Sequence, residues 1–160
     1  MGLTGFSFEL VSPVDPARMF KASVVDGHNL VPTIQPEVVS SAGILEGDGG
    51  PGSVRQFKFT EVIPFSHVEE RIEVLDEDKL EYKFTMKEAT HTGGRVISAT
   101  YNMKIEPSAD GGCICRTTAE YNTGGGVKAL DEEINSGKEG VMGMFKAIET
   151  YLIQNPSAYS

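Results

Sequence analysis

Alternation of apolar and polar residues is the feature that most restricts the fold of this chain. It is clearest in residues 80–86, LEYKFTM, where every second side chain is large and apolar: Leu80, Tyr82, Phe84 and Met86. Successive side chains of a strand point to opposite faces of a sheet, so the pattern predicts a strand with one apolar and one polar face. Similar alternation runs through residues 55–59, 68–74, 99–105 and 113–121. The pattern predicts an antiparallel sheet of about six or seven strands, whose apolar face needs a cover.

The C-terminal part of the chain supplies that cover. Apolar residues or glycines recur there at spacings of three and four, at Leu130, Ile134, Gly137, Val141, Met144, Ile148 and Leu152. This period predicts a long amphipathic helix that ends before Pro156. Residues 12–32 predict two short helices, because Pro16 suits a first helical turn and Gly27 can break the chain between them. One α+β domain over residues 1–160 follows, with a curved antiparallel sheet wrapped around one long helix.

Composition excludes several classes of function. With 160 residues and a net charge of -9, the chain has the size of one domain and lacks the clustered positive charge that a nucleic-acid backbone requires. Its apolar runs are shorter than the roughly 20 residues of a membrane span, and its first residues lack the pattern of a signal peptide. We therefore expect a soluble, non-secreted protein with no nucleic-acid partner and no membrane partner.

Two cysteines, Cys113 and Cys115, fall in the predicted strand 113–121. Residues two apart in a strand point to the same side, and their separation is too long for an easy disulfide. No matched set of histidines or further cysteines accompanies them. We therefore expect reduced thiols, no metal and no cofactor.

The apolar face carries groups that are unusual in a solid core. Polar or charged side chains lie among its apolar positions, namely Arg55, Glu70, Tyr82, Tyr101 and Arg116. A buried arginine is costly unless it is paired. Arg55, Arg116 and Glu70 therefore either pair with one another or lie where water and a ligand reach them. A carboxylate or phenol on a ligand would then replace one partner.

Three glycines interrupt the predicted C-terminal helix. Gly137, Gly140 and Gly143 each cost up to about 1 kcal/mol relative to alanine in a helix interior. One explanation is that they leave room on the inward face for something other than side chains. The alternative is that Gly140 and Gly143 lie partly on the outer face and merely weaken the helix.

The segment GDGGPG resembles a phosphate-binding loop at first sight. A loop of that kind needs a lysine and a following helix, whose N-terminus meets the phosphates. Here Ser53 and Val54 follow, no lysine is present, and the next residues alternate as a strand. We therefore predict a hairpin connection that leans over the mouth of the sheet, formed by Gly47, Asp48, Gly49, Gly50, Pro51 and Gly52.

Three segments resemble one protein family. Residues 46–53, EGDGGPGS, match the glycine-rich signature of the intracellular class-ten pathogenesis-related proteins of plants, the family of the major birch pollen allergen. Residues 110–113, DGGC, and 147–159, AIETYLIQNPSAY, are similar to the last hairpin and the helix end of that family. The resemblance implies a START-like helix-grip fold, with seven antiparallel strands and a long helix around a large internal cavity, and two short helices closing one end.

The same resemblance implies a function. It suggests a defence-related, allergen-like carrier or storage protein of the cytoplasm, with the nucleus as a second compartment, that binds amphipathic small molecules. Such ligands include cytokinins and other phytohormones, flavonoids and sterol-like metabolites. An apolar pocket with a few aimed polar groups suits them. We expect a monomer or a weak dimer.

Inward positions are the candidates for the ligand site. The apolar candidates are Phe57, Phe59, Val68, Ile72, Phe84, Ala99 and Met103 on strands, and Ile134, Gly137, Val141, Met144 and Phe145 on the helix. The polar candidates are Asn29, Arg55, Glu70, Tyr82, Tyr101 and Arg116. Methionine and aromatic walls adapt to flat, irregular ligands. The alternative for each apolar residue is plain core packing.

A ribonuclease is one alternative function, proposed for some members of the family. The resemblance would place its residues at Arg55, Glu149 and Tyr151, while the strand glutamate is replaced by Ile97. The chain also lacks paired histidines for general acid–base cleavage. These candidates are therefore weak, and Glu149 and Tyr151 are as easily explained by an ion pair and an apolar anchor.

Two further relatives suggest other functions. Norcoclaurine synthase uses a lysine on the last strand, with a tyrosine and an acidic residue on the strand before, where this chain has Arg116, Tyr101 and Met103. Arginine stays protonated and cannot serve as that base, although another role in specialised metabolism stays open. Abscisic-acid receptors, which inhibit a phosphatase, carry a Ser-Gly-Leu-Pro-Ala gate, whereas residues 60–66 here read TEVIPFS.

Overall fold

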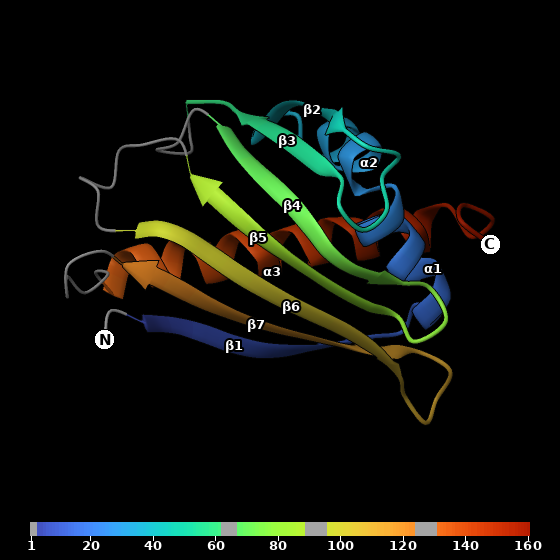
Figure 1. The fold of residues 1–160 in the computed structure, drawn as a ribbon. Coiled ribbons are helices and arrows are strands. Elements are labelled where there is room, and N and C mark those ends of the chain that lie inside the picture. The colour runs from blue at the N-terminus through green and yellow to red at the C-terminus, as the bar shows by residue number, and fades with distance from the viewer. Residues whose placement is uncertain (1–2, 62–66, 89–95, 124–130) are drawn as a thin grey trace.

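The computed structural model describes residues 3–61, 67–88, 96–123 and 131–160 (Figure 1). Its strands are β1 (Leu3–Ser12), β2 (Val39–Glu46), β3 (Val54–Phe59), β4 (His67–Asp76), β5 (Glu81–Glu88), β6 (Val96–Pro107) and β7 (Cys113–Thr123). Its helical elements are α1 (Pro16–Phe20), the π-helical turn η1 (Lys21–Val25), α2 (Gly27–Ile34) and α3 (Asp131–Gln154). The predicted α+β fold is confirmed.

The strands form a seven-stranded antiparallel sheet in the order β1-β7-β6-β5-β4-β3-β2. Five of the six connections between successive strands join neighbours in the sheet, and the sixth joins β1 to β2, which are the two edges. The chain leaves the β1 edge through α1, η1 and α2 and returns at the β2 edge. Strand β1 therefore pairs with the last strand, β7, and the sheet is complete only when both ends of the chain are in place.

Helix α3 runs along one face of the curved sheet, and the short helices lie at the end of the sheet near the C-terminus (Figure 1). The side of α3 toward the sheet carries Phe145, Ile148 and Leu152, which are all buried. The predicted amphipathic helix is confirmed, and it ends at Gln154, before Pro156. Leu130, the first residue of the predicted period, lies outside the described residues.

Local capping interactions and residue types set where the short helices begin and end. The Asp15 carboxylate accepts a hydrogen bond from the Arg18 backbone N–H at 3.1 Å, and Pro16 occupies the first turn. Helix α1 then continues directly into η1, and the helical backbone breaks at Asp26. Helix α2 starts at Gly27, so the predicted division into two helical segments is confirmed.

One side chain, Arg18, joins the N-terminal helices to the end of α3. Its Nε donates to the Ala158 carbonyl at 2.9 Å, and its Nη2 donates to the carbonyls of Leu152 at 3.2 Å and Asn155 at 3.0 Å. The last carbonyls of a helix have no partner within the helix and carry partial negative charge. Arg18 therefore satisfies the C-terminus of α3 with groups from a distant part of the chain.

Replacing Arg18 by alanine should lower the free energy of unfolding by about 1 to 3 kcal/mol, because charge-assisted hydrogen bonds to otherwise unpaired carbonyls are lost. Urea denaturation followed by circular dichroism measures the change. Lys146→Ala on the exposed side of α3 removes the same charge without such bonds and should cost less than about 0.5 kcal/mol. Equal losses in the two variants would contradict the capping role of Arg18.

Candidate ligand-binding site

The inner face of the sheet, toward α3, collects most of the predicted site residues. The strand residues buried there are Phe57, Val68, Ile72, Tyr82, Phe84, Ala99, Tyr101 and Met103. On α3, Phe145 is buried, while Ile134, Val141 and Met144 are partly buried against the core, as is Phe59 on β3. The predicted inward orientation of these residues agrees with the structure, and their role toward a ligand stays a prediction.

A charged cluster interrupts this apolar face. Arg55 on β3 and Glu70 on β4 are opposite each other in the register, with Arg55 Nη2 3.5 Å from Glu70 Oε1. Tyr82 on β5 lies between them: its hydroxyl accepts from Arg55 Nη2 and donates to Glu70 Oε1 at 3.2 Å. Arg55 Nη1 donates to the Val24 carbonyl of η1 at 2.8 Å. Of the two outcomes predicted for the charged residues, pairing of Arg55 with Glu70 is found.

Burial sets the ionisation of this cluster. It raises the pKa of Glu70, and the Arg55 charge and the Tyr82 hydroxyl partly oppose that rise. Burial also raises the pKa of Tyr82 well above its ordinary value, and the neighbouring Glu70 charge adds to the rise. The phenol is therefore neutral, and the carboxyl group is held closer to neutrality than an exposed glutamate.

His28 joins the cluster from α2, and sequence reasoning placed it only on a short helix. Its Nδ1 lies 3.3 Å from Arg55 Nη1 and accepts a hydrogen bond only when it carries no proton. Burial lowers the pKa of His28, the Arg55 charge lowers it further, and Asp26 opposes the change. No sequence signal joins these residues, because the contact depends on how α2 lies against β3.

Two buried polar atoms among the described residues have no hydrogen-bond partner, Arg55 Nε and Thr117 Oγ1. Arg55 is 3% exposed and Thr117 1% exposed. Thr117 lies opposite Phe8 and Met103 in the register of β7 with its two neighbours. An unpaired buried donor is costly, so each marks a point at which a ligand acceptor would be favourable. Sequence analysis missed Thr117, because threonine is common on both faces of strands.

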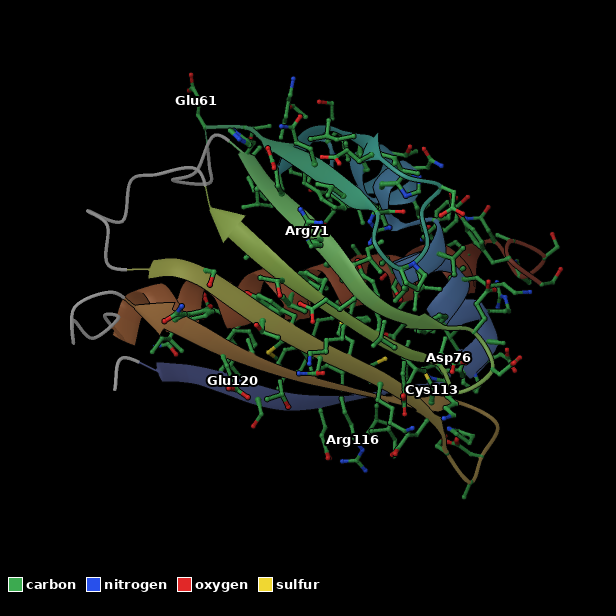
Figure 2. The ribbon with its side chains drawn as sticks, in the orientation of Figure 1. Glu61, Arg71, Asp76, Cys113, Arg116 and Glu120 are labelled. Carbon is green, nitrogen blue, oxygen red and sulfur yellow. The ribbon has the colours of Figure 1, made fainter. Side chains whose placement is uncertain are left out.

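The prediction that Arg116 points inward is wrong. Its side chain is 45% exposed, pairs with Glu9 on β1, and donates from Nε to Glu106 on β6 at 2.7 Å. Figure 2 shows it projecting away from α3. The reason is strand parity: its neighbours Cys115 and Thr117 on β7 are buried, so Arg116 between them faces outward.

The prediction that Asn29 is an inward polar anchor is also wrong. Asn29 is exposed on α2, and its Nδ2 donates to Asp26 Oδ1 at 2.7 Å. On α2 the buried residues are Gly27, Leu30 and Val31. The helical period therefore turns Asn29 to the outer side, where it ties the first turn of α2 to Asp26.

The glycine-rich loop connects two strands, as predicted, and three of its backbone N–H groups already have acceptors within the protein. Gly49 N–H donates to Ser53 Oγ and Gly50 N–H to Asp48 Oδ1, both at 2.9 Å. Gly52 N–H donates to the Ile72 carbonyl at 2.8 Å. Phosphate cradles need free backbone N–H groups and a cation. The Asp48 carboxylate accepts a hydrogen bond that a bound anion would otherwise accept. The loop is therefore a structural turn.

Gly47, Gly49 and Gly52 adopt positive φ angles of 88°, 99° and 89°. This left-handed region strains side chains other than glycine. At Gly47 a Cβ would also collide with Ser53, coming within 2.4 Å of its Oγ. The repeated glycines are therefore explained by the backbone path of the turn.

A family comparison decides what kind of protein this is. The model of the pathogenesis-related protein Bet v 1 family matches residues 1–155. The chain belongs to the Bet v 1 family. It is 37% identical to the major allergen Pru ar 1 of Prunus armeniaca and 39% identical to the pathogenesis-related protein STH-21 of Solanum tuberosum, over 160 residues and the full length of each.

Solved structures agree with this assignment. The crystal structure of Ara h 8.0201 matches with a TM-score of 0.86 and 34% identity, covering 95% of this chain and 99% of that one. Norcoclaurine synthase from Thalictrum flavum matches with a TM-score of 0.76 over 94% of this chain and 87% of that one. Its sequence identity is 16%, so this second likeness shows the fold alone. No helix within the described ranges has the length and apolar character of a membrane span.

The residues suggested for enzyme activities come from different elements of the fold. Arg55 bonds Val24, Tyr82 and Glu70 in the interior, whereas Glu149 and Tyr151 lie in the last turns of α3. An RNA phosphodiester would have to enter the core of this Bet v 1 protein to meet Arg55. The position offered for a condensation base, Arg116, is on the outer face. Residues 62–66, most of the segment compared with the abscisic-acid gate, lie outside the described residues.

Glycines of α3 divide into two kinds. A Cβ on Gly137 would come within 2.2 Å of the Tyr121 hydroxyl and 3.6 Å of the Phe6 ring. Gly137 therefore admits the side chain of Tyr121, and the prediction that it leaves free space is wrong. A Cβ on Gly140 or Gly143 would meet nothing within 4 Å. Gly140 is exposed, and the helical period places Gly143 opposite the buried stripe, which agrees with the outer-face alternative.

Alanine substitutions separate these two kinds of glycine. Gly137→Ala should lower the free energy of unfolding by about 1 to 3 kcal/mol, because the added methyl group displaces the buried ring of Tyr121. Gly140→Ala should raise it by up to about 1 kcal/mol, because only helix propensity changes. Thermal and urea unfolding of both variants give the comparison. A stabilising Gly137→Ala would show that Tyr121 does not need the space.

Protonation of His28 should make stability depend on pH. Its pKa is lowered in the folded protein, so the unfolded chain binds the proton more tightly, and stability falls as the pH drops below about 6.5. His28→Gln keeps a hydrogen-bond acceptor for Arg55 without titrating. As the pH falls, the free energy of unfolding of the natural protein, relative to that of this variant, should decrease by at most about 1.4 kcal/mol per pH unit. Parallel curves for the two proteins between pH 8 and 5 would contradict this role.

Proposed function

We propose that this protein binds amphipathic small molecules between the inner face of its sheet and α3. The observation that carries the proposal is the Arg55 cluster: a charged group set into an apolar face, with Arg55 Nε buried and unpaired among the described residues. Small-molecule sites are mostly apolar, with a few aimed polar groups that orient the ligand. This inner face has that composition.

Some apolar side chains of the sheet and of α3 are not fully buried. Phe6, Met86, Val141 and Met144 pack against the core but keep partial exposure. Residues that face the inside of a solid core would lose that exposure. These side chains therefore offer accessible apolar surface, and methionines adjust it to irregular shapes.

Stacked aromatic rings form part of the wall on the central strands. The rings of Phe84 and Tyr101 are nearly parallel, with centroids 5.0 Å apart, and Tyr82 lies 5.0 Å from Phe84. Such a surface favours flat, partly aromatic molecules. A ligand with an apolar body and one acidic or phenolic group would lie along these rings and present its oxygen to Arg55 or Tyr82.

This ligand class includes cytokinins and other phytohormones, flavonoids and related plant metabolites. Norcoclaurine synthase, which shares the fold, has a structure in complex with dopamine and hydroxybenzaldehyde, two small aromatic molecules. The pathogenesis-related names of the relatives support a defence-related role. We propose that binding, rather than catalysis, is that role here, since Ile97 stands in place of the ribonuclease glutamate and Arg116 in place of the condensation lysine.

Dye displacement tests the proposal directly. The chain has no tryptophan, so an anilinonaphthalene dye is used as the reporter. The dye should bind saturably and be displaced by some members of a panel of cytokinins, flavonoids, indoles and sterols. Val141→Phe adds bulk to the inner side of α3 and should weaken dye binding. Arg116→Ala changes only the outer face and is the matched control.

The polar end of the site has a sharper test. Tyr82→Phe should weaken a ligand with an acidic or phenolic group by about ten-fold, the effect of one hydrogen bond, and leave its methylated analogue unchanged. Circular dichroism and urea unfolding confirm that each variant is folded. Absence of saturable dye binding, or equal binding by Val141→Phe and the natural protein, would overturn the proposal.

A further inference from the structure

A pair of thiols lies outside the proposed ligand contacts and has no role in them. Cys113 and Cys115 are free cysteines on β7, 0% and 1% exposed. Both side chains point to the same side of the strand, as the sequence predicts, and their Sγ atoms are 4.0 Å apart in hydrogen-bond contact. Figure 2 labels Cys113 at the start of β7, near the end of the sheet that carries α1.

We propose that Cys113 and Cys115 form a binding site for one soft monovalent metal cation, of which Cu(I) is the biological example. Two thiolates bound to one ion at about 2.3 Å are about 3.8 Å apart at a tetrahedral angle and about 4.6 Å apart in a linear arrangement. The observed 4.0 Å lies between these limits. An ion can therefore bridge the two sulfur atoms without a shift of the backbone.

The strand holds this spacing in advance. Cys113 is opposite Ser12 on β1 and Pro107 on β6, and Cys115 is opposite Leu10 and Ile105. A strand paired on both sides has little freedom to change the distance between its side chains. The same rigidity opposes a disulfide, which would require the sulfur atoms to approach to about 2.05 Å.

The number of ligands selects the kind of ion. Among the residues that the structure describes, no group of three or more histidine, cysteine, aspartate or glutamate side chains could hold a metal. Zn²⁺ in structural sites takes four such ligands. Soft cations that accept thiolates, such as Cu(I), suit a site with two sulfur ligands and an apolar surrounding.

The binding step is an exchange of ions without oxidation. Starting from one thiolate and one thiol, two S–Cu bonds form, the S–H bond of Cys115 breaks, and its proton passes to solvent. The site carries one negative charge before and after the exchange. Starting from two thiols, two protons are released, so affinity rises with pH.

Anaerobic competition with bicinchoninate measures the affinity of the full-length, reduced protein for Cu(I). We expect one equivalent of Cu(I) with an ultraviolet thiolate-to-copper band and release of protons. Cys113→Ser and Cys115→Ser should each lower the affinity by more than about 100-fold, since loss of a mere outer-shell partner of a metal ligand already costs 10- to 100-fold. Zn²⁺ should compete poorly.

Controls separate this site from other sulfur atoms and from misfolding. Met142→Leu removes a sulfur elsewhere on α3 and should leave the affinity unchanged. Cys115→Ala is a second variant in case Cys115→Ser unfolds, and circular dichroism verifies each fold. Affinities of the folded single-cysteine variants equal to that of the natural protein would overturn the proposal, as would a complex that forms without proton release.

Discussion

The buried guanidinium of Arg55 is the constraint on which much of this architecture depends. An unpaired cation in the core would be unstable, and each of its contacts comes from a different element. It bonds the Val24 carbonyl of η1, His28 of α2, Tyr82 of β5 and, by charge, Glu70 of β4. Its plane also lies over the ring of Tyr82, 5.4 Å from the centroid. The helices that close one end of the sheet are thus held by the same group that gives the interior its polarity.

The general fold was predictable because its signals are local and repeated. Alternation in strands such as β5 and the three-to-four period of α3 define which face of each element is apolar, and burial of those faces against each other leaves few arrangements. The path of the glycine-rich loop was predictable for the same reason, since the absence of a lysine and the following strand pattern are visible in sequence. Resemblance then supplied the number of strands.

Details of the site were harder to predict where the two faces of a strand look alike. Strand β7 reads CICRTTAEYNT, with Ile114 on the outer face and Thr117 on the inner face, so hydropathy does not identify the inward parity around Arg116. Asn29 and His28 are neighbours on α2, yet only His28 reaches Arg55. Which of them does so depends on how the helix packs on the sheet, a tertiary relation without a sequence period.

The position of β1 has a consequence for the making of the protein. This strand is synthesised first, but it pairs with β7, from Leu3 opposite Asn122 to Ser12 opposite Cys113. Its inward side chains Phe6, Phe8 and Leu10 therefore have no sheet to join until most of the chain has left the ribosome. The apolar side chains of β1 therefore stay without their sheet partner until β7 has been made.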